Sequence, residues 1–320
     1  MKILVCGSGV IGSLLIHTLL QNNNEVTVLA RGKRREELEK YGLRTKFHGK
    51  KVVNTDSPRV VGKIPAEHFD LAFSVMQHEQ QWKLLKTLGE ADCSAVVLVG
   101  NNLSAPEMKQ QIIEAGGKNV LFGFQGTGGN RYEDYTEVLS LHAPSMVLGG
   151  LGENIPGEIT SIVESTFAGA DYEIKWMDDM DAWYKCHAAF IVPVARLCYT
   201  VGCDLRKSTG KQRKMLFDAT SNAFEALKKS GCAVRPEGED AYYRTGAKRV
   251  LMSAMMNIMC HTKLGDMAAS DHCRHAVSEM EGLAVKMDEI VFNSGVECSA
   301  YKSMKDSAPS WEEIHRIYDK

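Results

Sequence analysis

The chain has 320 residues and a formal net charge of −2. This length exceeds the usual 100 to 200 residues of one domain and predicts two, and the 44% hydrophobic and 24% charged residues are typical of a folded protein rather than a disordered one. The balanced charge argues against a general nucleic-acid binder, which would be basic, and no run of 18 or more apolar residues predicts a membrane helix.

The nine cysteines are read as reduced thiols. Their number is odd, no Cys-x-x-Cys occurs, and Cys6 and Cys198 stand in apolar runs where cysteine acts as a small hydrophobe. The apolar run near Met1 is short and leads into glycines, unlike a signal peptide. We therefore expect a cytoplasmic protein without a disulfide framework.

Residues 1–177 alternate short apolar runs with amphipathic stretches. This alternation predicts a doubly wound α/β sheet of the Rossmann type, mostly parallel and with helices on both faces. The expected strands are residues 2–6, 25–29, 71–75, 95–99 and 119–124, with 145–148 as an edge strand. The expected helices are residues 11–21, 34–41, 79–88 and 105–115.

Residues 178–320 lack strand patterns and predict an all-helical second domain. Their apolar periods predict long helices at residues 181–200, 211–229, 239–262 and 271–293. Gly231 and Gly295 follow the ends of two of these helices, where a left-handed backbone favours glycine.

The strongest local motif is Gly7-Ser8-Gly9-Val10-Ile11-Gly12, placed between the first strand and the first helix. In a dinucleotide-binding turn the first glycine allows the tight turn, the second lets the pyrophosphate approach, and the third allows close packing of the helix. The free amides of the helix N-terminus favour an anion there. This context favours cofactor binding over a glycine turn that serves packing alone.

A basic cluster after the second strand favours NADP (NADPH) over NAD. No Asp or Glu stands where a ribose 2′-hydroxyl would need one, whereas Arg31 lies where an arginine can pair with a 2′-phosphate. Of the neighbouring Lys33, Arg34 and Arg35, at least two are expected to form only a solvated helix start.

Taken together, these motifs resemble the ketopantoate reductase family over nearly the whole chain. The matching residues include Ala30-Arg31-Gly32, the strand at 70–75 and the turn Leu98-Val99-Gly100-Asn101-Asn102. In the second half, Trp183-Tyr184-Lys185 resembles the family's Trp-x-Lys, and Ser278-Glu279-Met280-Glu281 resembles its Thr-Glu-x-Asp.

The resemblance implies an NADP-dependent oxidoreductase that reduces a 2-oxoacid between its two domains. Lys185 would be the proton donor and Glu279 its orienting or substrate-binding partner, with Glu281 as an alternative to Glu279. Asn101 would contact the nicotinamide or the substrate. A lysine ammonium both stabilises an alkoxide and protonates it, although most helix lysines only face water.

Several positions depart from the family pattern. Asparagines that usually follow the lysine are replaced by Ala189 and Pro193, and a lysine after the fourth strand is replaced by Gln77, which we still place at the cofactor. Losing polar contacts changes specificity, so we expect a different oxoacid or ketone. His187 lies on another face of the helix than Lys185.

Two further stretches carry possible ligands. Residues 271–275 read Asp-His-Cys-Arg-His, but a zinc site needs three or four converging groups, so we expect no metal and place His272, or alternatively His275, at the substrate. The glycine-rich residues 124–131 lack the P-loop pattern and are expected to form a loop near the cofactor.

The sequence thus predicts an NADPH-dependent reductase whose partner is a small-molecule carbonyl compound, with neither nucleic acid nor membrane as a partner. The resemblance also allows a homodimer formed through the helical domain. Two alternatives remain: an authentic 2-dehydropantoate 2-reductase of pantothenate biosynthesis, and a catalytically inactive NADP-binding sensor.

Overall fold

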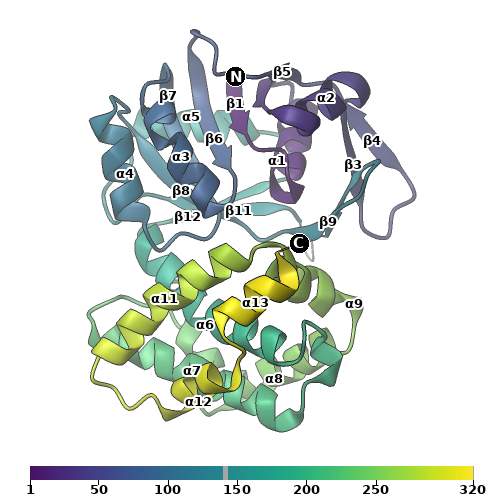
Figure 1. Cartoon of the computed structure of the whole chain (residues 1–320). Helices are drawn as coiled ribbons and strands as arrows, with labels where there is room; N and C mark the ends of the chain where they lie inside the picture. Colours follow the sequence, from purple (N-terminus) through teal and green to yellow (C-terminus); the bar gives the residue numbers. More distant parts are fainter. Residues whose placement is uncertain (140–142, 320) are drawn as a thin grey trace. The chain divides into compact units, whose positions relative to one another are not determined.

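The computed structural model describes residues 1–139 and 143–319 (Figure 1). The chain divides into two compact units, Met1–Met180 and Asp181–Lys320. Unit 1 combines sheets and helices, and unit 2 is helical, so the expected fold class is confirmed.

The main sheet of unit 1 has eight strands in the order β12-β11-β8-β7-β6-β1-β2-β5. All neighbours are parallel except β11 and β8. The strands are β1 (Lys2–Cys6), β2 (Glu25–Leu29), β5 (Arg59–Val61), β6 (Phe69–Val75), β7 (Cys93–Val99), β8 (Val120–Gln125), β11 (Ser145–Gly149) and β12 (Glu173–Met177). The expectation that residues 145–148 form an edge strand is wrong, because β12 returns to pair with β11 and becomes the edge.

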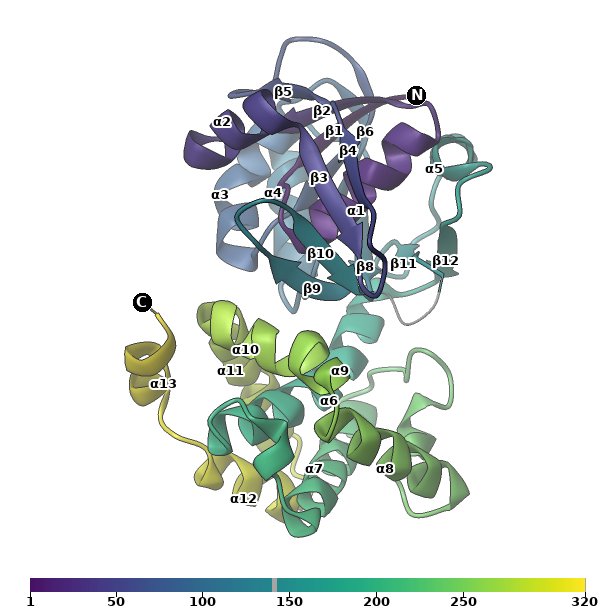
Figure 2. The same cartoon turned by 90° about the vertical axis from the view of Figure 1, so that its right-hand side faces the viewer.

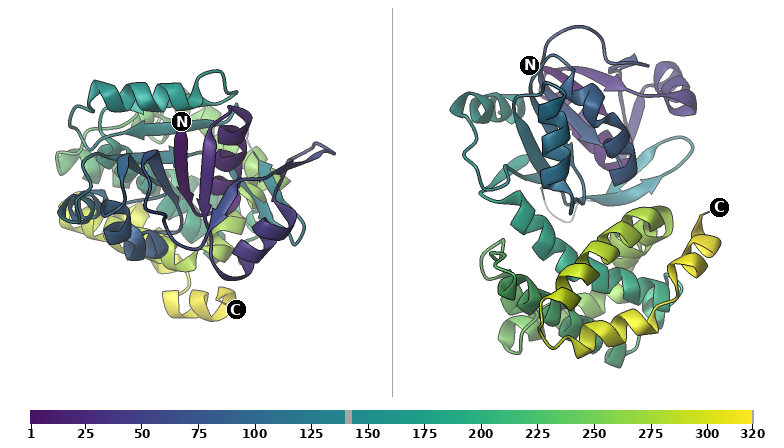
Figure 3. Two further views of the ribbon diagram at one scale, coloured as in Figure 1. Left: turned by 90° about the horizontal axis from the view of Figure 1, so that it is seen from above. Right: turned by 60° about the vertical axis from the view of Figure 1, so that its left-hand side comes forward.

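Five helices flank this sheet: α1 (Val10–Gln21), α2 (Gly32–Tyr41), α3 (His78–Gly89), α4 (Ala105–Glu114) and α5 (Gly157–Phe167). Apolar side chains of α1 and α5, such as Leu15 and Val163, share one buried core with inward residues of the strands, such as Phe73. Helices α3 and α4 pack together against β6, β7 and β8. The helices therefore cover both faces of the sheet (Figure 3).

A second sheet of four strands, in the order β4-β3-β10-β9, was not anticipated (Figure 2). Its members are β3 (Leu43–Phe47), β4 (Val53–Asp56), β9 (Gly128–Arg131) and β10 (Thr136–Leu139). These strands are only four or five residues long and carry many polar side chains, so they lack the apolar signal of a buried strand. The sheet packs on α1, which places β9 close to the glycine turn.

Unit 2 is built of helices throughout. They are α6 (Met180–Thr200), η1 (Leu205–Lys207), α7 (Gly210–Lys229), η2 (Glu239–Tyr242), α8 (Ala247–Cys260), α9 (Lys263–Gly265), the π-helical turn η3 (Asp266–Ser270), α10 (Asp271–His275), α11 (Val277–Asn293), α12 (Ser299–Ser307) and α13 (Trp311–Tyr318). Gly231 and Gly295 have positive φ angles of 81° and 68°, as expected. Within the described ranges, no helix is both long and apolar enough to cross a membrane.

Two expected long helices are interrupted. The helix expected at 239–262 breaks because Gly246 takes a φ of 146°, a backbone that only glycine adopts readily. The helix expected at 271–293 breaks at Ala276, whose φ of −135° is not helical. Near this break the Cys273 carbonyl oxygen accepts a hydrogen bond of 2.8 Å from the Tyr199 hydroxyl on α6. Alanine favours a helix, so this contact with α6, and not the residue at the break, accounts for the interruption.

Candidate active site

The glycine turn joins β1 to α1, and each of its three glycines has a separate steric role. Gly7 has a φ of 107°, and a Cβ there would lie 2.3 Å from the Val75 carbonyl oxygen. A Cβ on Gly12 would lie 2.2 Å from the Gly7 carbonyl oxygen. A Cβ on Gly9 would meet nothing within 4 Å. Gly7 and Gly12 are thus required by packing, whereas the space in front of Gly9 is open to a ligand.

This turn places the start of α1 at the open space. Gly9 is the N-cap residue and has no side-chain cap, and the first turn of the helix, which begins at Val10 and Ile11, contains no acidic residue. Backbone amides at a helix N-terminus attract anions because they lack partners within the helix and lie at the positive end of its dipole. The arrangement fits the pyrophosphate of a dinucleotide.

Two further predicted residues lie at the same edge of the sheet. Gln77 follows β6 and is the N-cap of α3, and Asn101 follows β7 directly after Gly100, whose φ is 140°. Strands β1, β6 and β7 are parallel neighbours, so their carboxyl ends bring the glycine turn, Gln77 and Asn101 to one edge. Ligands of open α/β sheets bind at this edge.

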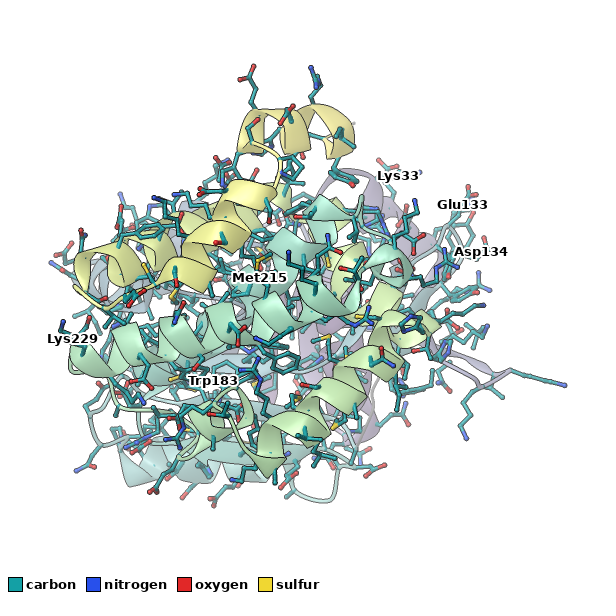
Figure 4. The ribbon with its side chains drawn as sticks, turned by 90° about the horizontal axis from the view of Figure 1, so that it is seen from below. Lys33, Glu133, Asp134, Trp183, Met215 and Lys229 are labelled. Atoms are coloured by element: carbon teal, nitrogen blue, oxygen red, sulfur yellow. The ribbon has the colours of Figure 1, made fainter. Side chains whose placement is uncertain are left out.

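The basic residues after β2 differ in their surroundings. Arg31 is the exposed N-cap residue of α2. Lys33 points outward (Figure 4), and Arg35 is exposed and pairs with Glu39 at 2.7 Å. Both agree with a solvated helix start.

Arg34 is different, because it contacts the glycine turn itself. Its Nε donates to Ser8 Oγ at 3.1 Å, and its Nη2 donates to the Ser8 carbonyl oxygen at 3.0 Å. The pKa of Arg34 is lowered by burial and by the charge of Arg131, against the opposing effect of Glu37. Sequence reasoning left one of Lys33, Arg34 and Arg35 open for a role beyond a solvated helix start but did not single out Arg34. The sequence offered one indication: Arg34 stands three residues after Arg31, so on a helix the two side chains lie on the same face.

In unit 2, Lys185 lies in the first turns of α6. Its Nζ donates to Asp181 Oδ2 at 2.5 Å, one helical turn earlier, and its side chain is 30% exposed. The ion pair orients the ammonium group while leaving part of it accessible. The positions that follow on α6 are apolar and buried, namely Ala189 and Pro193.

His187 is partly buried on another side of α6. Its ring stacks on Trp183 with a centroid distance of 5.0 Å. Burial, and then the charge of His272, lower the pKa of His187 to about 4. His187 is therefore neutral near pH 7.

Glu279, at the start of α11, pairs with His272 on α10. The distance from His272 Nε2 to Glu279 Oε1 is 3.2 Å, and the two side chains are 42% and 9% exposed. Burial opposes a charge on His272, but the hydrogen bond and charge of Glu279, and then Asp271, raise its pKa overall. A half-exposed histidine whose charged form is favoured by a buried carboxylate is suited to bind an anion.

The remaining candidates have structural partners. His275 Nδ1 lies 2.9 Å from the Asp271 carbonyl oxygen, as expected for a ring folded back on its own helix. Among the described residues, no group of three or more His, Cys, Asp and Glu side chains is arranged to hold a metal ion. The stretch 124–131, expected to be a loop, instead forms the end of β8, a turn and β9.

Comparison with known proteins places this geometry in context. Residues 3–149 match the family model described as ketopantoate reductase PanE/ApbA. A solved D-mandelate dehydrogenase with NADH and anilino(oxo)acetate has a TM-score of 0.69 and 16% identity, covering 100% of both chains. The comparison with curated proteins gives no match.

Two solved reductases share the same fold. The 2-dehydropantoate 2-reductase of Geobacter metallireducens has a TM-score of 0.72 and 15% identity, covering 96% of this chain and 98% of that one. A probable 2-dehydropantoate 2-reductase of Bacillus subtilis has a TM-score of 0.70 and 14% identity, covering 99% of this chain and 100% of that one. At such identities the likeness establishes a common fold over the whole length.

Proposed function

The chain carries a ketopantoate reductase PanE/ApbA family domain at residues 3–149 and shares its fold over its whole length with solved members, and from this we propose that it is an NADPH-dependent reductase of a 2-oxoacid or related ketone. The observation that carries the proposal is the open space at Gly9 in front of the α1 N-terminus. Gly7, Ser8, Val10, Ile11 and Gly12 complete the cradle. Such a space admits a pyrophosphate where any side chain would fill it.

Bound NADPH would supply a hydride to the carbonyl carbon of the substrate. The oxygen then carries the negative charge, and we propose that the Lys185 ammonium stabilises and protonates it, giving an alcohol. Asp181 holds Lys185 in place through their 2.5 Å ion pair. Asn101 and Gln77, at the carboxyl edge of the sheet, would orient the nicotinamide end of the cofactor.

The substrate proposal rests on what surrounds Lys185 and Glu279. Ala189 and Pro193 offer no hydrogen bonds to a substrate hydroxyl, which disfavours ketopantoate itself. His272, held by Glu279, would bind the carboxylate of an oxoacid. The neighbour with anilino(oxo)acetate supports an oxoacid substrate outside the ketopantoate class.

Lys185→Ala tests the proton donor. Turnover should fall by about 10²-fold or more, since general acid catalysis contributes about 10²–10⁴-fold, while NADPH affinity stays unchanged. Lys214→Ala is the matched control, because Lys214 forms a similar ion pair along its helix, 2.7 Å from Asp218. Equal turnover in the two variants contradicts the assignment of Lys185.

The class of substrate is tested by NADPH consumption with a panel of 2-oxoacids and neutral ketones that includes ketopantoate. We expect turnover with an oxoacid other than ketopantoate. Fastest turnover with ketopantoate would instead identify an authentic 2-dehydropantoate 2-reductase. NADPH binding without consumption by any carbonyl would identify a non-catalytic sensor.

A further inference from the structure

Three cationic side chains gather around one carboxylate beside the glycine turn. Glu37 Oε2 accepts a hydrogen bond from Arg34 Nη1 at 3.2 Å and lies 3.6 Å from Arg131 Nη2. Lys33 Nζ lies 4.0 Å from the other oxygen, Oε1. Lys33 is 82% exposed, so water and salt screen its charge. The two arginines and Glu37 by themselves leave an excess of one positive charge.

Arg34 ties this group to the phosphate-binding backbone. Its Nε and Nη2 both donate to Ser8, and Nη1 donates to Glu37. A guanidinium has five N–H groups in a planar fork, so these bonds fix its plane and leave further N–H groups directed away from Ser8 and Glu37. The fork matches the geometry of a phosphate.

Arg131 comes from β9 in the second sheet, outside the β1-α1-β2 unit. β9 lies against the start of α1, since a Cβ on Gly129 would lie 3.0 Å from Val10 Cγ1. Just before β9, Gln125 Nε2 donates to the Ile11 carbonyl oxygen at 3.2 Å. These contacts hold the strand that carries Arg131 beside the glycine turn.

The position and charge of this group indicate its ligand. Lys33, Arg34 and Glu37 follow β2, where a Rossmann domain meets the adenosine ribose. A 2′-phosphate carries a charge of about −1.5 to −2 near pH 7. Glu37 is paired with arginines instead of being offered to a ribose 2′-hydroxyl. Glu133 and Asp134 in the turn after β9 are exposed (Figure 4), where water and salt screen their charges.

We propose that Arg34 and Arg131, held by Glu37, form the subsite for the 2′-phosphate of NADPH, so that the second sheet takes part in choosing the cofactor. This proposal rests on the proposed use of NADPH and extends it beyond Arg31. Arg131 acts on the phosphate alone, whereas Arg34 also positions the turn through Ser8.

The first test measures the affinities of NADPH and NADH by fluorescence titration of single variants. Arg131→Gln should weaken NADPH on the order of tenfold, the loss expected for one charge-assisted hydrogen bond, and leave NADH unchanged. Arg34→Gln should weaken both cofactors and NADPH more. Arg35→Gln is the matched control, since it removes the same charge from α2 at a residue paired with Glu39.

The proposal is overturned if Arg131→Gln and Arg35→Gln bind NADPH equally well. A second test uses adenosine 2′,5′-bisphosphate against adenosine 5′-diphosphate, and so needs neither turnover nor a nicotinamide. The unaltered protein should bind the 2′,5′-bisphosphate more tightly, and Arg131→Gln should remove the difference. Equal binding of the two nucleotides by the unaltered protein refutes the subsite. If the preference is present but no carbonyl is reduced, the proposed reaction fails while the subsite stands.

Discussion

The two glycines Gly9 and Gly12 should respond in opposite ways to alanine, although they lie only three residues apart. A Cβ on Gly12 would lie 2.2 Å from the Gly7 carbonyl oxygen, so the turn or the helix must move by roughly 1 Å to reach an ordinary contact. Overpacking of this kind costs about 1–3 kcal/mol. The better helix propensity of alanine returns up to about 1 kcal/mol, so the net loss is at most about 3 kcal/mol and is largest if the backbone cannot move.

Gly9→Ala has no such cost. Gly9 has an ordinary φ of −71°, and its Cβ would meet nothing within 4 Å. Alanine restricts the unfolded chain, which stabilises by about 0.4–1 kcal/mol, but it is a poorer N-cap than glycine. The free energy of unfolding should therefore change by less than about 1 kcal/mol. NADPH binding should nevertheless be largely lost, because the methyl group enters the space that we assign to the pyrophosphate.

Urea unfolding at pH 7 and NADPH fluorescence titration separate the two effects. We expect Gly9→Ala to keep the stability and lose the cofactor, and Gly12→Ala to lose stability first. Gly210→Ala, at an open position at the start of α7 in unit 2, controls for glycine replacement in general. The reasoning is refuted if Gly9→Ala binds NADPH as tightly as the unaltered protein, or if it is destabilised as much as Gly12→Ala.

Three further outcomes are expected. Arg31→Ala should weaken NADPH much more than NADH in the same titration, and an equal loss for both would contradict its pairing with the 2′-phosphate. The pKa of His187 is 6.5 in the unfolded chain and about 4 in the folded protein, so the native state resists protonation of this residue. The contribution of His187 to the free energy of unfolding is therefore complete above pH 6.5 and is lost as the pH falls toward 4. Urea unfolding should therefore show about 3 kcal/mol of stability lost across this window that is absent in His187→Gln, and parallel pH profiles would refute the burial argument. His272→Gln should raise KM for an anionic oxoacid with little change in kcat, whereas His275→Gln should leave KM unchanged; a shared effect would place neither residue at the carboxylate.

Much of unit 1 was predictable because its signals are local. The apolar runs at 2–6 and 25–29 form strands with the expected bounds, and the spacing of Gly7, Gly9 and Gly12 identified the turn. The backbone at Gly7 has a positive φ, which glycine adopts readily and other residues avoid, so the residue type alone predicts this conformation. The same applies to Gly231 and Gly295 in unit 2.

Other features depended on partners far along the chain. The contact of Arg34 with Ser8 arises from the packing of α2 over the glycine turn, and Arg131 reaches Glu37 only because the short strands of the second sheet assemble on α1. Neither contact leaves a periodic pattern in the sequence. The short strands of the second sheet are polar, and polar stretches of four or five residues resemble loops.

The sequence by itself determined six strands of the main sheet, the helices α1 to α4 and the tight glycine turn, and it indicated the candidate lysine, because each of these signals lies in neighbouring residues or within one helical turn. Tertiary structure decided which cation contacts the glycine turn, that β12 rather than β11 forms one edge of the main sheet, and that the surroundings of His187 lower its pKa. These features depend on burial and on contacts between segments far apart in the sequence. Both the desolvation of a side chain and its contacts with distant residues arise only when the chain has folded, so no local pattern of residues encodes them.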